Sequence, residues 1–179
     1  MTQARKTVRR AALLAFLLAP ALGAALEPRY DHRDLQGPVV EALVAHDTVA
    51  ISGKASASSW RPALRLGYGW DVLGEGNELM VGLTGTLASW DNPAQENVLL
   101  TADLRYRAYF GTEEWKTFFD VGLWAPLKSR VGVGPMVGLG VIYDWSRSGG
   151  VFVSGGFSSS FGEARIASFY ASTGLQLRF

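Results

Sequence analysis

Hydrophobic and polar side chains alternate with a period of two along one segment of the chain after another. Between residues 64 and 72, one face would carry Leu64, Leu66, Tyr68, Trp70 and Val72. Residues 100–110 alternate in the same way, with Leu100, Ala102, Leu104, Tyr106, Ala108 and Phe110 on one face. This pattern predicts β-strands that each have one apolar and one polar face.

Further segments with this alternation cover residues 78–90, 115–125, 131–145, 151–161 and 165–179. Most of them reach the roughly 9–11 residues that a tilted strand needs to cross a bilayer, whereas strands of soluble proteins average about 5–6. Short turn signals rich in Gly, Asn, Asp and Ser separate the segments, which favours antiparallel pairing of neighbours. Strand length therefore indicates a membrane-spanning sheet.

The first strand has two interpretations. The favoured one places it at residues 37–47 with Glu41 pointing inward, followed by a Ser/Gly/Ala-rich loop over residues 48–59. The other makes residues 38–46 a short helix started by a proline and puts strand one at 49–58. Either way the count is about eight, an even number, which lets both chain ends lie on one side. We predict an all-β fold, an antiparallel up-and-down transmembrane β-barrel of about eight strands, whose closure removes exposed edges.

Aromatic residues fall at the ends of the predicted strands. If the chain is threaded up and down, one rim receives Trp70, Phe110, Trp115, Tyr143 and Trp145, and the other receives Phe161 and Phe169. Amphipathic rings gather at the two interfaces of a bilayer. We therefore predict an aromatic girdle at each rim.

The polar faces carry charges of both signs that would point into a closed barrel. The predicted lumen network consists of Glu41, Asp71, Asp103, Asp120 and Asp144 with Arg65, Arg105, Arg107, Lys116 and Arg178, and Glu78 shares their face. Buried charges persist when they are paired and hydrogen-bonded, so we expect a cross-barrel ionic network that fills the lumen. The alternative is a pathway for protons or ions. Small inward residues such as Gly67, Gly82 and Gly138 would make room for the long arginines.

The N-terminus has the features of a secretory signal. Residues 1–10 contain four cations and no acid, and an apolar run that is shorter than the roughly 20 residues of a spanning helix follows. We predict a signal peptide over residues 1–25 and a barrel domain over 26–179, of which 26–36 form a periplasmic tail. Removing the four cations leaves 13 basic against 16 acidic residues, so the formal charge changes from +1 to −3. Nucleic-acid binding then loses its compositional support.

The last eight residues, which run from Ser172 to Phe179, carry a family resemblance. A polar residue, a glycine and hydrophobic residues spaced by two precede a C-terminal aromatic, and this pattern resembles the terminal signal of bacterial outer-membrane proteins. The resemblance implies that the assembly machinery recognises Ser172, Gly174, Leu177 and Phe179. The mature chain is similar to the small outer-membrane barrels of about eight strands, with the architecture of the OmpA membrane domain and OmpX. The similarity implies a location in a Gram-negative outer membrane and no specific activity.

Three classes of function remain open at this point. The leading expectation is a non-enzymatic structural or surface protein with a side-chain-filled lumen, in contact with outer-membrane lipid and lipopolysaccharide and with an unknown surface partner. An enzyme that modifies lipid A would have to use His46 and Asp47 with one of the serines between residues 52 and 59, yet adjacent strand residues point to opposite faces. A narrow passive pore is the third. The chain has no cysteine and only two histidines, so we expect no cofactor and no metal site.

Overall fold

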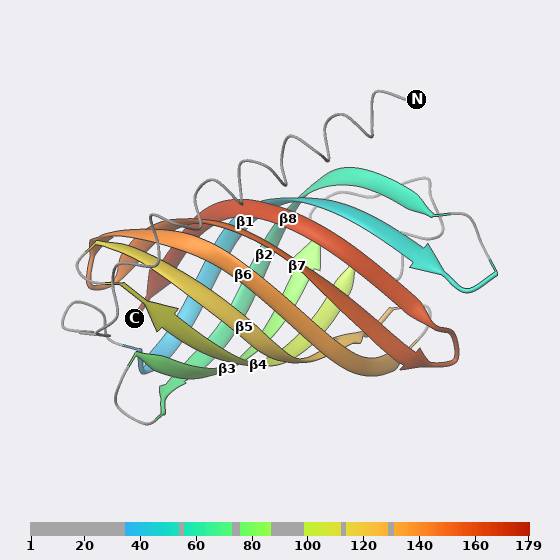
Figure 1. Ribbon diagram of the computed structural model, residues 1–179, viewed down its shortest axis with the longest axis horizontal. Coiled ribbons are helices and arrows are strands. Elements are labelled where there is room, and N and C mark those ends of the chain that lie inside the picture. The colour runs from blue at the N-terminus through green and yellow to red at the C-terminus, as the bar shows by residue number, and fades with distance from the viewer. Residues whose placement is uncertain (1–34, 54–55, 73–75, 87–98, 112–113, 129–130) are drawn as a thin grey trace.

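The chain forms a closed antiparallel β-barrel of eight strands (Figure 1). The computed structural model describes residues 35–53, 56–72, 76–86, 99–111, 114–128 and 131–179. The strands are β1 (Gly37–Ile51), β2 (Ala57–Asp71), β3 (Asn77–Thr86), β4 (Leu100–Phe110), β5 (Trp115–Pro126), β6 (Gly132–Ser146), β7 (Gly149–Gly162) and β8 (Ile166–Arg178). The predicted fold class and strand number are thereby confirmed.

Each strand pairs with the next along the chain, and β1 pairs with β8 to close the ring. The closing register sets Glu41 opposite Gln176, and the backbone amide of Phe179 donates to the carbonyl of Pro38 at 3.1 Å. Gly37 and Phe179 therefore mark one end of the barrel, which we call the terminal rim (Figure 1). The opposite end, where the β1–β2 and β7–β8 hairpins turn, we call the distal rim.

The first hairpin corrects both interpretations of the N-terminal region. Residues 38–46 form a strand and no helix, and β1 continues to Ile51, so most of the predicted loop over 48–59 is paired sheet. Thr48 stands opposite Ser58, and Val49 opposite Ala57. The start of β2 is hard to recognise from the sequence, because its serines are typical of a loop and because proline, here Pro62, is rare inside sheets. Pro62 pairs with Val44 of β1 but lies before Ala63, where the described pairing of β2 with β3 begins, and proline is tolerated at such an edge.

The lumen is filled differently at its two ends. Near the distal rim, an apolar cluster consists of Val49, Ile51, Ala57, Trp124, Met136 and Ile166. Near the terminal rim, a second cluster consists of Leu35, Tyr109, Phe118, Ile142 and Phe152. Charged side chains occupy the space between them. The charged pairs Lys116–Asp144 and Arg178–Glu78 extend past the second cluster toward the terminal rim.

The predicted signal peptide and most of the predicted tail lie outside the described residues. Within the part of the chain that is described, no helix is long and apolar enough to cross a membrane.

Candidate functional site

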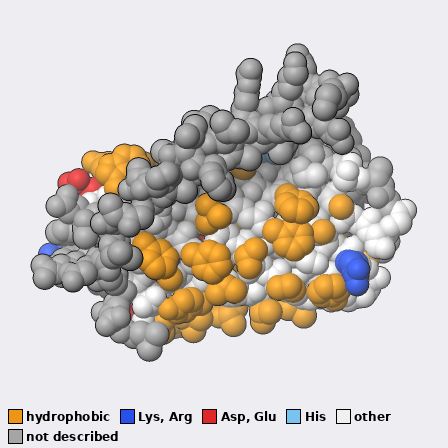
Figure 2. All heavy atoms as spheres, in the orientation of Figure 1, with side chains coloured by type: hydrophobic (Ala, Val, Ile, Leu, Met, Phe, Trp, Pro, Cys, Tyr) orange, Lys and Arg blue, Asp and Glu red, His pale blue; other side chains and the backbone are white. Residues whose placement is uncertain are grey.

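The outward faces of the strands are mostly apolar and exposed. Hydrophobic side chains cover much of the face that Figure 2 shows. Mid-strand examples that are 43–64% exposed are Val44, Leu66, Leu83, Leu104, Leu123, Leu139, Val153 and Leu175. A water-soluble protein rarely exposes so continuous an apolar surface, so this surface indicates a lipid environment.

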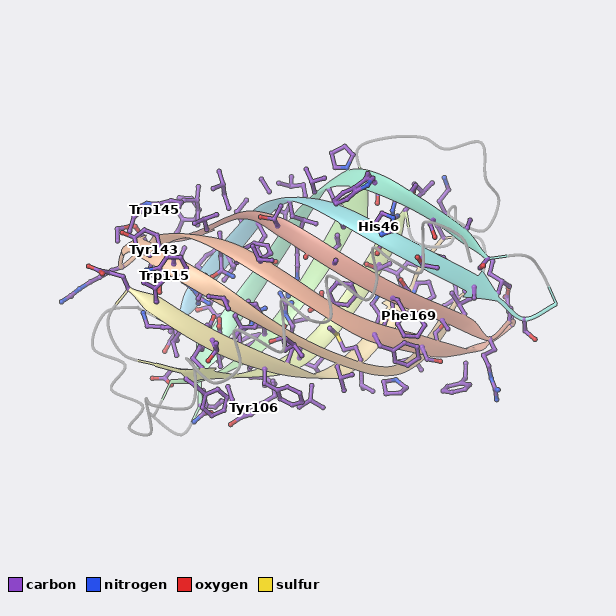
Figure 3. The ribbon with its side chains drawn as sticks, turned by 45° about the horizontal axis from the view of Figure 1, so that its top comes forward. His46, Tyr106, Trp115, Tyr143, Trp145 and Phe169 are labelled. Atoms are coloured by element: carbon purple, nitrogen blue, oxygen red, sulfur yellow. The ribbon has the colours of Figure 1, made fainter. Side chains whose placement is uncertain are left out.

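Aromatic side chains lie toward both rims of this surface. Near the terminal rim, Trp70, Phe110, Trp115 and Trp145 are 41–64% exposed and Tyr143 is half-buried. Trp115 and Tyr143 are in contact, with ring centroids 5.0 Å apart. Toward the distal rim lie Phe161 and Phe169, which are 50% and 61% exposed. Figure 3 shows Trp115, Tyr143 and Trp145 gathered at one end of the barrel and Phe169 toward the other.

Trp60 adds an aromatic ring that was not predicted, because it directly follows residues 48–59, which have the composition of a loop. Trp60 is 62% exposed and packs edge-on against His46, with centroids 5.0 Å apart. The ten residues that separate Trp60 from Trp70 on β2, at about 3.3 Å each and a tilt of about 45°, correspond to roughly 23 Å along the barrel axis. An apolar band of about 25 Å is typical of membrane barrels. The spacing of these rings therefore matches a bilayer.

Three acids and three bases form the central part of the lumen. Arg65 donates two hydrogen bonds to Asp103, from Nε at 3.0 Å and from Nη2 at 2.7 Å. Arg107 holds Asp120 in the same two-point manner, at 2.6 and 2.8 Å. Arg105 lies between these pairs, 3.3 Å from both Glu41 and Asp120. Such forked contacts are the strong form of an ion pair.

Further pairs flank this central cluster. Toward the terminal rim, Lys116 donates to Asp144 at 2.8 Å and Arg178 donates to Glu78 at 2.6 Å. Toward the distal rim, Arg61 pairs with Asp47 and also donates to Thr86 at 3.2 Å. All of these charged side chains are buried. Most of the predicted network residues thus meet across the barrel.

Asp71 is the exception, because it was predicted to belong to the lumen network and is not buried there. It is the last residue of β2, where it is exposed and lies opposite Glu78 in the register. Its strand position points inward, but its side chain is exposed at the end of β2. The Asp47–Arg61 pair was not predicted. Among the described residues, six acids and six bases are therefore buried, and their formal charges balance.

Glycines create the room for the large inward side chains. A methyl group on Gly82 would overlap the guanidinium of Arg65. A methyl group on Gly138 or Gly156 would lie 2.6 Å from the Tyr170 hydroxyl. These glycines are therefore required for packing at these sites, in line with the expectation that small inward residues make space.

A cavity of about 130 Å³ remains in the lumen. Charged side chains from β1, β2 and β4 line one side of it. Hydroxyl groups of β7 and β8 line the other, from Ser154, Ser158, Ser168, Tyr170 and Ser172.

Comparisons with known proteins bear on the fold. No protein-family model matches the chain, and no curated protein matches its sequence. Among solved structures, Neisserial surface protein A matches with a TM-score of 0.57 and 15% identity, over 80% of this chain and 97% of that protein. The chain has the fold of the small eight-stranded outer-membrane barrels.

Other small barrels match with lower scores. Ail, the attachment invasion locus protein of Yersinia pestis, has a TM-score of 0.46 and 12% identity, over 79% of this chain and 99% of that protein. The N-terminal barrel domain of Pseudomonas aeruginosa OprF has a TM-score of 0.44 and 14% identity, over 80% and 98%.

In this small outer-membrane barrel fold, the terminal pattern is divided between the two faces of β8. Leu177 and Phe179 point outward and are 42% and 76% exposed. Ser172 points inward and shares a hydrogen bond of 2.8 Å with Ser154. Gly174 also faces inward, where a methyl group would overlap the backbone of β1. The recognition of these residues by assembly machinery stays a prediction.

The residues of the alternative catalytic site do not come together. His46 faces outward against Trp60, whereas Asp47 faces the lumen and pairs with Arg61. Ser58, on the face of His46, shares a hydrogen bond with Thr48. Over the described residues, no group of three or more potential ligands could hold a metal ion.

Proposed function

We propose that the chain is a non-enzymatic protein of a bacterial outer membrane, with a structural or surface-interaction role. The observation that carries this proposal is the contrast between the two faces of the barrel. The outward face is apolar with aromatic rings toward both rims, and the inward face consists largely of paired charges. A closed barrel of this kind satisfies every backbone group between its strands, which a bilayer requires.

The other two classes are less favoured by the packing. A nucleophilic site needs a base within hydrogen-bond reach of a hydroxyl and oriented by a third group, and His46 and Asp47 point to opposite faces. A conducting pore needs a continuous polar path, and the cluster around Phe118 and Ile142 closes the lumen near the terminal rim.

In this proposal the terminal rim faces the periplasm and the distal rim faces outward, toward lipopolysaccharide. Arg165 lies in the β7–β8 turn, where it is exposed and stacks over Phe161 at 5.2 Å. A guanidinium on an interfacial ring keeps its edge free to donate to phosphate oxygens. Outer-leaflet lipid is thus a partner that fits this rim, together with the assembly machinery, and a protein partner at the surface stays unassigned.

Fractionation of cells that express the full chain tests the location. The processed protein should sediment with the outer membrane and should migrate differently on gels with and without boiling, as closed barrels do. Recovery from the soluble periplasmic fraction would contradict the proposal. Comparison of lipid A from a deletion strain and its parent tests the absence of enzymatic activity, because a lost acyl modification would instead support the lipid A enzyme.

A further inference from the structure

Leu35 lies inside the barrel although it precedes the first strand. It is 4% exposed and belongs to the apolar cluster near the terminal rim. The other buried members of this cluster come from four strands of the barrel wall and are Tyr109 of β4, Phe118 of β5, Ile142 of β6 and Phe152 of β7. A leucine in a solvated tail would have no such neighbours. The segment that leads into β1 therefore enters the lumen.

The backbone of Leu35 is held on the other side of the lumen. Arg178 of β8 donates a hydrogen bond from Nη1 to the Leu35 carbonyl at 2.9 Å, and its Nη2 donates to Glu78 at 2.6 Å. A methyl group on Gly69 of β2 would lie 2.9 Å from the same carbonyl oxygen. In the ring of eight strands β8, β1 and β2 are neighbours, and β4, β5 and β6 lie opposite them. Leu35 thus reaches from one side of the lumen to the other.

Two glycines give the segment room. Gly37 has a φ of +141°, which glycine adopts readily and other residues rarely do. A methyl group on Gly37 would overlap the backbone carbonyl of Phe179. Gly69, which has no side chain, leaves the space next to the Leu35 carbonyl free. The chain can therefore turn from the lumen into β1 at the rim itself.

The contacts of Leu35 differ from those of the barrel wall. β1 begins at Gly37, so Leu35 precedes the strand pairing that the structure describes. If Leu35 left the lumen, its apolar contacts and the hydrogen bond from Arg178 would be lost, but the eight strands would keep their pairing. A local opening that breaks few contacts costs much less free energy than unfolding of the whole fold. Closure by this segment is therefore reversible.

The central charges lie directly behind this closure. Phe118, which belongs to the same cluster, has the guanidinium of Arg107 over its ring, 3.9 Å from the centroid. Arg107 in turn holds Asp120 in the forked pair described above. Ion pairs are stronger where water is excluded. A segment that closes the terminal mouth therefore also shields the central ion pairs from solvent on this side.

We propose that the segment before β1 is a reversible plug of the terminal mouth, in which Leu35 is the stopper and Arg178 holds the backbone in place. The plug separates solvent at the terminal rim from the apolar cluster and from the central charges. Its withdrawal opens the mouth while the ring of strands stays closed. This device goes beyond the structural role proposed above, and it does not depend on which side of the membrane the terminal rim faces.

Single-cysteine variants test where the segment lies, because the chain contains no cysteine. Leu35→Cys puts a thiol on the buried residue, and Gln36→Cys puts one on its exposed neighbour. The purified, folded protein in detergent micelles is treated with iodoacetamide, and the gel shift on boiling verifies that each variant is folded. We expect Leu35→Cys to react about tenfold more slowly than Gln36→Cys, or slower still, because it reacts only when the plug opens. Equal rates would show that the segment is a free tail and would overturn the proposal.

A second pair of thiols tests whether the segment seals the mouth. Ile142→Cys lies in the apolar cluster behind the plug, and Met136→Cys lies in the distal cluster. When combined with Leu35→Ser, which removes the apolar stopper, Ile142→Cys should react about tenfold faster than with Leu35 in place, whereas the rate of Met136→Cys should change by less than about twofold. Leu35→Met keeps an apolar side chain of similar volume and should leave Ile142→Cys protected.

Two results would contradict the plug. If the reactivity of Ile142→Cys is the same with Leu35 and with Leu35→Ser, the barrel wall alone closes the mouth. If Leu35→Ser raises the reactivity of Ile142→Cys and Met136→Cys alike, Leu35 supports the barrel as a whole and does not close one end of it.

Discussion

The forked pair between Arg65 and Asp103 gives the sharpest test of the lumen. We propose to measure the free energy of unfolding of Arg65→Met, Asp103→Asn and the double variant, and to compare them as a cycle. Arg65 is buried and donates at 3.0 and 2.7 Å to the two carboxylate oxygens of Asp103. The residues come from β2 and β4, so the pair spans the intervening strand β3.

The size of the effect follows from what remains after each change. With Arg65→Met, Asp103 keeps Arg105 as a neighbour, but the closest contact is 3.5 Å and is too long for a good hydrogen bond. Two charge-assisted hydrogen bonds are then lost and the balanced cluster gains an uncompensated negative charge. Each such bond contributes about 1.5–3 kcal/mol, and breaking a buried pair costs about 3–5 kcal/mol. We expect a loss of about 3 kcal/mol for either single variant.

The double variant removes both charges and restores the balance. It should therefore be more stable than the sum of the single effects implies, with a coupling of about 2 kcal/mol. The assay is urea unfolding of the barrel in lipid vesicles, followed by tryptophan fluorescence and by the gel shift on boiling. Arg165→Ala, at an exposed turn, is the control and should change stability by less than about 0.5 kcal/mol. Additive single effects would refute the argument that this pair acts as a buried unit.

Further predictions use the same unfolding assay unless stated otherwise. Leu104→Arg aims a cation at lipid from a residue that is 43% exposed on β4 and should cost about 2–4 kcal/mol, more than Leu104→Ala; an equal cost would contradict a lipid-facing position. Gly82→Ala should cost about 1–3 kcal/mol because its methyl group displaces the Arg65 guanidinium, whereas Gly85→Ala, with nothing within 4 Å, should be nearly neutral. Deletion of Phe179, whose amide bonds Pro38, should lower the amount of folded protein in the outer membrane without reducing export; undiminished assembly would show that the terminal pattern is coincidental. In planar bilayers the purified protein should show no steady single-channel conductance, and a large reproducible conductance would favour the pore.

The barrel could be predicted from the sequence because each strand carries its own period-two signal. On β4, for example, Leu104 and Tyr106 alternate with Asp103, Arg105 and Arg107, so one strand shows both faces. The pairing of β1 with β8 could not be predicted from any local sequence pattern. It followed from the even strand number and from the general cost of leaving edges open.

The first hairpin was harder to predict because its local signals conflict. On β2, Arg61 and Ala63 face inward and Trp60 faces outward, which is a regular alternation. Pro62 keeps an outward position in this alternation, but proline is rare inside sheets, and the neighbouring serines have the composition of a loop. The loop interpretation covers residues 48–59 and the next predicted strand segment begins at Leu64, so neither the pairing of Asp47 with Arg61 nor the position of Trp60 was predicted. Pairing across thirteen residue pairs with β1 outweighs these local preferences.

Asp71 shows what a period-two pattern does not predict. Alternation assigns a side chain to a face but does not say how far along the barrel axis the packed lumen extends. Asp71 and Arg65 share a face of β2, yet Arg65 is buried in the central cluster and Asp71 is exposed beyond it. Axial position depends on the stagger of all eight strands, which a single strand does not encode.

The lumen charges also fix the register of the barrel. A slip of one residue along β4 would turn Arg105 and Arg107 toward lipid and Leu104 into the charged cluster. Two arginines near the middle of a bilayer cost about 2–4 kcal/mol each, so the slip would cost roughly 4–8 kcal/mol before the lost ion pairs are included. The whole stability of an ordinary domain is about 5–15 kcal/mol. If isolated polar residues stood in place of these charges, a slip of one residue would cost less free energy. The paired charges of the lumen are therefore also the groups that specify which face of each strand meets the membrane.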